Sequence, residues 1–213
     1  MKERPILFSG PMVRAILEGR KTQTRRIIKG DIVSRPSAGG VRKLFSLADP
    51  IDLGDVSRIL KASNEPYNPH RDICPYGKPG DRLWVRETWR LYDSLVECAC
   101  YDACECSRHH GKPLYRASLP DNEGPWKPSI HMPRWASRIT LEVTEVRVER
   151  LKDISRGDCM AEGCPFPNVA GVFNPVAWYW ALWSTINGPE SWHANPWVWV
   201  IEFKRVNQEV SAA

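Results

Sequence analysis

The chain has 213 residues, of which 42% are hydrophobic and 26% are charged. This composition is typical of a globular protein with a sizeable core, and it excludes a largely disordered or fibrous chain. No segment approaches the eighteen uncharged apolar residues of a membrane span, and residues 1–5 lack the apolar stretch of a signal peptide. We therefore expect a cytoplasmic protein with no membrane partner.

The charge balance is mildly basic, with 30 Lys and Arg against 25 Asp and Glu and a net charge of +5. This bias is compatible with a polyanionic partner such as RNA. Seven cysteines cannot all pair with one another, and a cytoplasmic chain keeps its thiols reduced.

The N-terminal segment predicts a strand at residues 5–8 followed by a helix at 10–19. Ser9 or Gly10 suits the N-cap, Pro11 suits the first turn, and Gly19 suits a left-handed stop. A further strand is expected at 82–87, after a turn formed by Pro79 and Gly80.

Residues 137–151 alternate strongly between apolar and polar, which predicts a long strand. The apolar residues Ile139, Leu141 and Val143 have odd numbers, whereas Val146 and Val148 have even numbers and therefore a different parity. The change of parity near residues 144–145 predicts a bulge or a corner, as a small closed barrel requires.

Two helices and a final strand are expected in the C-terminal part. Ser155 and Asp158 form a capping pattern for a helix at 155–162 that ends at Gly163. The second helix, at 175–186, is expected to place Val176, Trp180 and Trp183 on one face. Residues 197–204 are apolar on both faces for much of their length, which is typical of a buried strand.

The remaining segments are rich in Gly, Pro, Ser and charge, with weak periodicity. We expect a single α+β domain over residues 1–206, built on a small mixed β-barrel with flanking helices. It would carry loop-rich insertions at about 30–77 and 91–133, and residues 207–213 would form a flexible tail.

A cationic segment follows the first predicted helix and reads Gly19-Arg20-Lys21-Thr22-Gln23-Thr24-Arg25-Arg26. It resembles the signature loop of the ASCH domains, small barrels related to the PUA RNA-binding fold, whose pattern is Gly-x-Lys-x-x-(Glu or Thr)-x-Arg. The turn at 80–81, the helix at 154–163 and the strand at 198–204 agree with this family in order. The overall look, including the run at residues 75–81, is similar to ASCH proteins of bacteriophages and prophages.

The resemblance implies a function. One bacterial branch of the superfamily hydrolyses the N4-acyl amide of acetylated cytidine with a Lys, a Thr and a Glu, which match Lys21, Thr24 and Glu162 here. Lys21 would be a base or an electrostatic clamp, Thr24 the nucleophile or the holder of a water, and Glu162 a proton shuttle. The base role requires burial and neighbouring cations to lower the pKa of Lys21. No catalytic metal is required.

Other readings stay open at this point. The segment from Arg20 onwards could be a solvated basic face, or the chain could be an RNA-binding module or a ribonuclease on the same scaffold. The candidate nucleic-acid or substrate contacts are the cations and ring side chains Arg20, Arg25, Arg26, Arg82, Trp84, Arg86 and Trp135, with Trp84 or Trp135 as a stacking platform for a base.

A cluster of soft ligands lies in the second predicted insertion. Cys98, Cys100, Cys104 and Cys106 are followed by His109 and His110, and zinc prefers such thiolate and imidazole sets. The spacing differs from paired Cys-x-x-Cys knuckles, so a structural zinc and a loop of reduced thiols are both open.

Overall fold

The computed structural model describes residues 1–28, 74–94, 108–119, 124–166 and 174–206, together with the backbone of strands β3 (Ile32–Ser34) and β4 (Arg42–Phe45). Within this part of the chain, no helix is both long and apolar enough to cross a membrane. The described residues form an α+β fold with one five-stranded sheet and two two-stranded sheets.

The main sheet has mixed topology. Its strands in spatial order are β1 (Glu3–Leu7), β5 (Arg82–Arg86), β8 (Thr140–Arg150), β9 (Trp197–Val206) and β2 (Gln23–Ile27). The pair β1 and β5 is parallel, and the other neighbours are antiparallel. Among the described residues β1 and β2 are the two edges and do not pair, so the sheet that the structure describes is open, not the closed barrel expected from the sequence.

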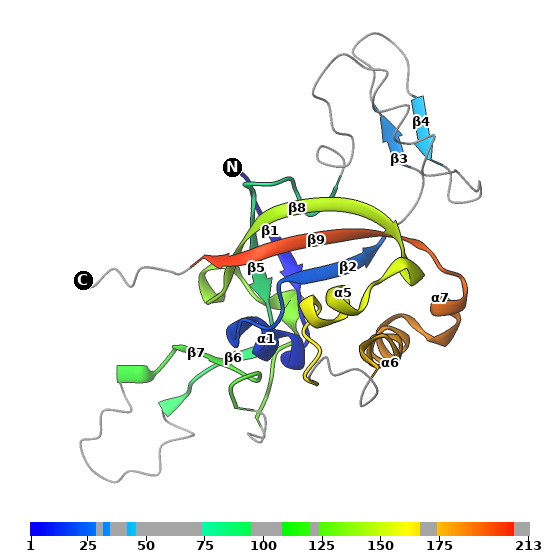
Figure 1. Cartoon of the computed structure of the whole chain (residues 1–213). Helices are drawn as coiled ribbons and strands as arrows, with labels where there is room; N and C mark the ends of the chain where they lie inside the picture. The colour runs from blue at the N-terminus through cyan, green and yellow to red at the C-terminus, as the bar shows by residue number, and fades with distance from the viewer. Residues whose placement is uncertain are drawn as a thin grey trace.

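The predicted irregularity in the long strand is confirmed. The register of β8 against β9 shifts between Val143 and Glu145, so Thr144 is an extra residue at that point. An extra residue increases the local twist and bend. Both strands curve strongly across the molecule (Figure 1), and apolar residues on either side of the bulge can therefore face the same core.

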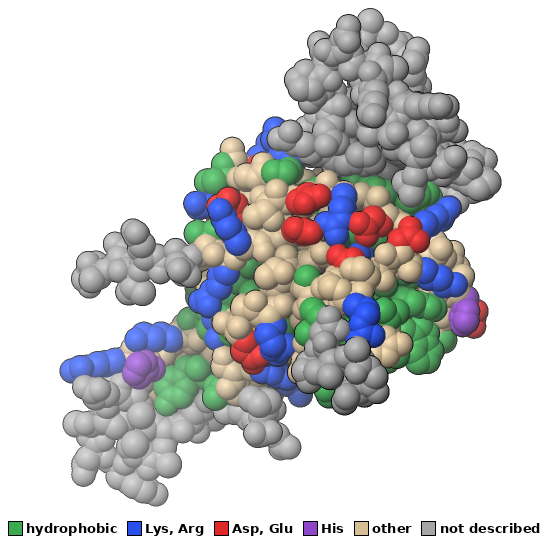
Figure 2. All heavy atoms as spheres, viewed as in Figure 1, with side chains coloured by type: hydrophobic (Ala, Val, Ile, Leu, Met, Phe, Trp, Pro, Cys, Tyr) green, Lys and Arg blue, Asp and Glu red, His purple; other side chains and the backbone are tan. Residues whose placement is uncertain are grey.

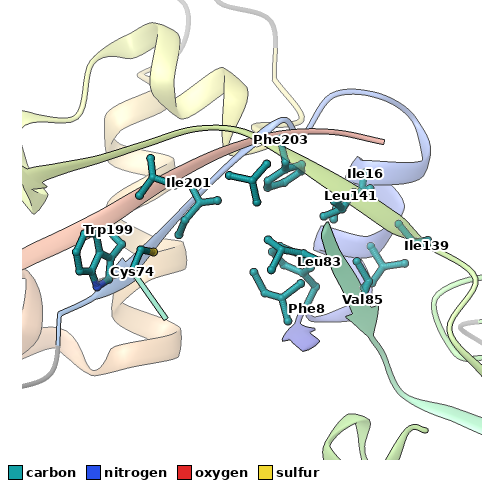
Figure 3. Packing of buried hydrophobic residues seen from close by; sticks show 14 of the residues in the cluster. Phe8, Ile16, Cys74, Leu83, Val85, Ile139, Leu141, Trp199, Ile201 and Phe203 are labelled. Carbon is teal, nitrogen blue, oxygen red and sulfur yellow. The ribbon is translucent and has the colours of Figure 1, made fainter. Parts of the chain in front are cut away.

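Strand β9 separates two hydrophobic clusters, which explains why it is apolar on both faces. Trp199, Ile201 and Phe203 pack into the larger cluster, with Leu83 of β5 and with α1 (Gly10–Leu17) (Figure 3). Val198 and Val200 point to the other side, into a smaller cluster with residues of α5 (Arg156–Ala161) and α6 (Pro175–Asn187). The prediction of a buried strand is confirmed.

The ends of two helices follow the sequence signals closely. Ser9 has the N-cap conformation of α1, Pro11 lies in its first turn, and Gly19 has a φ of 76° just beyond its end. For α5, Ser155 and Asp158 form both hydrogen bonds of a capping box, and Glu162 is the C-cap. Helix α5 therefore ends at the residue that the resemblance singled out.

We expect Ser155→Ala to lower the free energy of unfolding by about 1 kcal/mol, because the Ser155 hydroxyl accepts a hydrogen bond from the Asp158 N–H. Ser9→Ala is the matched control, since Ser9 is also an N-cap but makes no capping bond through its side chain. Urea unfolding followed by circular dichroism measures both changes. Equal losses in the two variants would contradict the capping role.

The buried face of α6 differs from the expected one. Tyr179 and Trp183 are buried, whereas Trp180 is 45% exposed and was wrongly placed on the core face. The helix is apolar nearly all round, so periodicity alone could not choose its buried side. Hydrophobic side chains consequently gather on the surface around α6 and the short helix α7 (Pro189–His193) (Figures 1 and 2).

Parts of the two predicted insertions belong to the packed structure. Cys74 and Ala117 lie in the larger cluster, and Met132 packs in a third cluster with Trp89. Strands β6 (Trp89–Leu91) and β7 (Pro113–Tyr115) pair as a hairpin. Three short 3₁₀ helices were not predicted, at Ser129–His131, Arg134–Ala136 and Leu151–Asp153. The tail at 207–213 lies outside the described residues.

Candidate active site

The segment between α1 and β2 joins the ends of two helices. The N–H groups of Arg20 and Lys21 both donate to the Ala15 carbonyl, and the Thr22 N–H donates to the Ala161 carbonyl at 2.8 Å. Lys21 and Glu162 also form an isolated antiparallel bridge. The start of β2 therefore lies against the end of α5 (Figure 1), although the two segments are far apart in sequence.

Gly163 allows this close approach. Its φ is +97°, a region that residues with a side chain rarely adopt. A Cβ atom there would lie 3.0 Å from the Ala15 Cβ and 3.1 Å from the Lys21 Cβ. Glycine at this position therefore serves both the end of α5 and the contact with Lys21.

Lys21 and Glu162 form a buried ion pair. The side chain of Lys21 is 0% exposed and that of Glu162 is 3% exposed, and Lys21 Nζ lies 2.7 Å from Glu162 Oε2. Nζ also donates to the carbonyls of Gln23 at 2.7 Å and of Glu162 at 2.9 Å. The three N–H bonds of an ammonium group thus all have acceptors.

Burial lowers the pKa of the Lys21 ammonium, and the charge and hydrogen bond of Glu162 offset part of that effect. The cations Arg26 and Arg25 lower the pKa further. The sequence-based expectation of a lowered pKa, through burial and neighbouring arginines, agrees with this environment. The side chain of Arg20 binds Glu18 and the Gly163 carbonyl.

Arg25 lies on the other side of Glu162 and is completely buried. Its Nη2 contacts Glu149 at 3.0 Å and Asp158 at 3.3 Å, and its Nη1 lies 3.6 Å from Glu162 Oε1. Nη1 of Arg25 and Oε1 of Glu162 make no hydrogen bond, so the ion-pair contact at 3.6 Å joins these two atoms to each other. The Arg25 guanidinium is therefore fixed in the interior by three carboxylates.

A second arginine, Arg147, contacts Glu149 and Asp158, the carboxylates that in turn contact Arg25. It contacts Asp158 at 3.1 Å, Glu149 at 2.5 Å and also Glu202. Acidic and basic side chains are intermingled over the region of β8, β9 and α5 (Figure 2). Burial would raise the pKa of Asp158, but hydrogen bonds from Ser155 and the charge of Arg25 outweigh it and lower that pKa overall. Asp158 therefore stays ionised and fixes Arg25.

A small inner cavity of about 60 Å³ adjoins these groups. Thr24, Arg25 and Glu162 are among the polar residues that line it, and Tyr179 and Trp183 of α6 are among the apolar ones. Burial raises the pKa of the Tyr179 hydroxyl well above its usual range, and the Glu162 charge adds to that effect, so the hydroxyl stays protonated.

A larger outer cavity of about 280 Å³ lies next to the inner one. Both are lined by Met12, Glu162 and Leu182, so Glu162 stands at the boundary between them. The outer cavity adds the side chain of Trp178 and the cations Arg14 and Arg20. Met12 is an unbranched, flexible side chain that can adapt to a ligand at this boundary.

The three predicted catalytic residues lie close together, but they differ in their access to the cavities. Thr24 and Glu162 line the inner cavity, whereas Lys21 lines neither cavity and lies behind Glu162. With three acceptors around Nζ, Lys21 has no lone pair directed at Thr24. The geometry therefore favours a role for Lys21 in holding the Glu162 carboxylate in place, and it does not favour a role as a base.

The predicted nucleic-acid or substrate contacts are divided among several places. Arg25 and Arg26 line the inner cavity and Arg20 lines the outer one. Arg25 is too deeply buried to reach an RNA backbone at the surface, which corrects its predicted role as a phosphate contact. Arg26 donates to the Leu7 carbonyl at 2.6 Å and lies over the Phe8 ring.

The other predicted contacts form a separate surface and line neither cavity. The guanidinium groups of Arg86 and Arg134 lie 5.1 and 6.0 Å from the Trp84 ring. Trp135 is 65% exposed and meets Trp89 edge-on, and Arg82 is half-buried on the same strand as Trp84. The structure does not bring this group to Lys21 and Glu162.

The predicted zinc ligands Cys98, Cys100, Cys104 and Cys106 lie outside the described residues. His109 and His110 are described and exposed, and His110 Nδ1 lies 3.2 Å from the Ser94 hydroxyl. Within the described ranges, no cluster of three or more His, Cys, Asp or Glu side chains could hold a metal ion. The zinc hypothesis stays a prediction.

Several residues of the site were missed by sequence reasoning. Glu149 and Tyr179 had no assigned role, and Asp158 was predicted only as a capping residue. Alternation in 146–150 could have placed Arg147 and Glu149 on one face of the strand, but nothing local to the sequence relates that face to Arg25. Tyr179 could not be singled out in a helix that is apolar nearly all round.

Comparisons with known proteins found no family model, no curated protein and no solved structure that matches this chain. The resemblance to the ASCH domains therefore rests on the residues of the loop and on the order of the elements around it.

Proposed function

We propose that this protein is an ASCH-type amidohydrolase that removes the acyl group from an N4-acylated cytidine or a related modified nucleoside. The observation that carries the proposal is the position of Glu162: a buried carboxylate whose Oε2 is held by Lys21 and whose Oε1 lies 3.6 Å from Arg25, in a residue that lines both cavities. Such a carboxylate is positioned to accept and return a proton.

Each residue would have a separate role in the reaction. Thr24 holds the attacking water, because a threonine hydroxyl is a weak nucleophile and Lys21 does not face it as a base. Glu162 takes a proton from this water as the water oxygen bonds to the acyl carbon. Glu162 then gives the proton to N4 as the carbon–nitrogen bond breaks, which releases a carboxylic acid and the cytidine amine. Lys21 keeps the carboxylate in place throughout.

The two cavities suit the two halves of the substrate. Glu162 stands at their boundary, where an amide that spans both would have its acyl carbon on one side and its nitrogen on the other. The outer cavity is large enough for a pyrimidine ring and offers Trp178 as an aromatic neighbour. We propose further that the curved five-stranded sheet is the described part of a PUA-like barrel, in keeping with the bulge in β8.

RNA binding is the second candidate, and a specific surface favours it. Trp135 is exposed beside Arg134, which also lies near the Trp84 ring. Exposed rings among cations can stack on unpaired bases. An RNA affinity that falls steeply with salt and weakens in Trp135→Ala would support this function, and RNA cleavage in the same mixtures would indicate a ribonuclease.

The test of the proposed hydrolase is the loss of the acetylated chromophore when the purified protein is mixed with N4-acetylcytidine. We expect turnover by the native protein and a reduction of kcat/KM by about 10²-fold or more in Thr24→Val, because valine keeps the shape and removes the hydroxyl. Thr22→Val is the matched control, since Thr22 is exposed and lines neither cavity. No turnover at high protein concentration would reject the hydrolase.

A further inference from the structure

We propose that the outer cavity takes a phosphorylated nucleoside, and that Arg14 binds the phosphate group there. This inference rests on the proposed hydrolase function and deepens it, because it names the substrate as a nucleotide and assigns a further substrate-binding residue. Arg14 belongs to helix α1 and lies outside the loop that resembles the ASCH signature.

The walls of the outer cavity come from α1, from α6 and from the end of α5. Residues at the three- and four-residue spacing of one helix face line it from α1 and its C-cap, namely Pro11, Arg14, Ala15 and Glu18. Trp178 and Leu182 line it from α6, and Glu162 lines it from the C-cap of α5. The cavity of about 280 Å³ is thus a recess between helices, with Arg14 and Trp178 on different walls.

The two adjoining cavities have an excess of positive charge. Their charged lining residues are four arginines and two glutamates, namely Arg14, Arg20, Arg25, Arg26, Glu18 and Glu162. Arg20 is held by Glu18, and Arg25 is held by three carboxylates. Arg14 is half-buried and has no carboxylate partner among the described residues, so its charge is not neutralised within them.

The donors of Arg14 suit a phosphate group. Nη1 donates to the Ala117 carbonyl at 3.3 Å and so ties the guanidinium to the protein, while Nε and Nη2 make no hydrogen bond with the described residues. Two parallel N–H groups of a guanidinium bind two phosphate oxygens through charge-assisted hydrogen bonds.

An acylated cytidine is uncharged and has no group for this cation, whereas its phosphate ester is an anion. Glu162, Trp178 and Arg14 line one cavity. A nucleotide with its amide at Glu162 can therefore place its base beside Trp178 and its phosphate beside Arg14. The charge of the cavity thus favours a nucleotide over the nucleoside.

The first arm of the test measures binding without turnover, by calorimetric titration with cytidine and with cytidine 5′-monophosphate. We expect the monophosphate to bind at least about 10-fold more tightly at low salt, because hydrogen bonds to a charged group are the strong ones. The difference should shrink as the salt concentration rises. Equal affinities at low salt would overturn the proposal.

Three variants test the role of Arg14 in the same titrations. Arg14→Gln should lose the preference for the monophosphate, and a folded Arg14→Gln that keeps it would overturn the role. Arg150→Gln is the matched control, since Arg150 Nη1 also donates to a backbone carbonyl, at 3.2 Å, but the residue lines neither cavity. Glu18→Gln removes the acid beside Arg20 and should strengthen the binding of the monophosphate. If Arg14→Gln does not fold, no gain in Glu18→Gln would overturn the proposal.

The second arm compares kcat/KM for N4-acetylcytidine and for its 5′-monophosphate. We expect a value at least about 10-fold higher for the monophosphate in the native protein and in Arg150→Gln, and no such preference in Arg14→Gln. The phosphate of an RNA chain has the same chemistry, so a short RNA with one N4-acetylcytidine is the third substrate. Faster hydrolysis of this RNA would assign the phosphate to a chain, and faster hydrolysis of the monophosphate would assign it to a free nucleotide.

The two arms separate this inference from the proposed function. A preference for the monophosphate in binding that depends on Arg14, without hydrolysis of any acetylated substrate, would reject the hydrolase and retain the nucleotide site. Hydrolysis at equal rates with and without the phosphate, together with equal binding, would retain the hydrolase and reject the nucleotide site.

Discussion

Glu162→Gln is expected to lower kcat/KM for N4-acetylcytidine by about 10²- to 10⁴-fold, the usual range for loss of a general acid or base. Glutamine keeps the shape of the side chain and can still accept a hydrogen bond from Lys21 Nζ, which lies 2.7 Å from the carboxylate. It cannot take a proton from water or deliver one to the leaving nitrogen. Initial rates from the loss of acetylcytidine absorbance measure the change.

Glu149→Gln is the matched control for this prediction. Glu149 is another carboxylate that contacts Arg25, at 3.0 Å, but it lines neither cavity. We expect its rate to fall by less than about 10-fold, because it positions Arg25 without touching the substrate. Equal losses in both variants would assign the effect to the charge balance around Arg25 and would contradict proton transfer by Glu162.

The elements that were predicted well are those determined by residues that lie close together in the sequence. The capping box of Ser155 and Asp158, the stop at Gly163 and the bulge after Val143 each depend on residues close together in sequence. Backbone hydrogen bonding and the two-residue period of a strand act at this range. The motif loop was located for the same reason.

The site itself could be predicted only in part, because its chemistry depends on contacts across the chain. Resemblance brought Lys21 and Glu162 together, yet which side of Glu162 faces a cavity is decided by the packing of α6. Arg25 was predicted as a nucleic-acid or substrate contact, with a solvated basic face as the alternative because charge runs are usually exposed. Its three carboxylate partners come from β8 and α5, at 124 to 137 positions further along the chain, where no local pattern points back to it.

Lys21→Met is expected to lower the free energy of unfolding by about 3–5 kcal/mol, because the buried Glu162 carboxylate loses the cation that is hydrogen-bonded to it and keeps Arg25 at the longer distance of 3.6 Å. Methionine has a similar length and flexibility, so the loss reports charge and hydrogen bonding more than volume. Urea unfolding at neutral pH measures it. Lys152→Met, at an exposed lysine, should change the same quantity by less than about 0.5 kcal/mol.

The double variant Lys21→Met/Glu162→Gln distinguishes a clamp from a base. Removing both charges should recover part of the stability lost in Lys21→Met, because no carboxylate that has lost its hydrogen-bonded cation remains in the interior. Its hydrolytic rate should stay as low as that of Glu162→Gln alone, since Lys21 acts only through Glu162. A double variant much slower than Glu162→Gln would instead mean that Lys21 contributes to the reaction independently, as the activating base of Thr24.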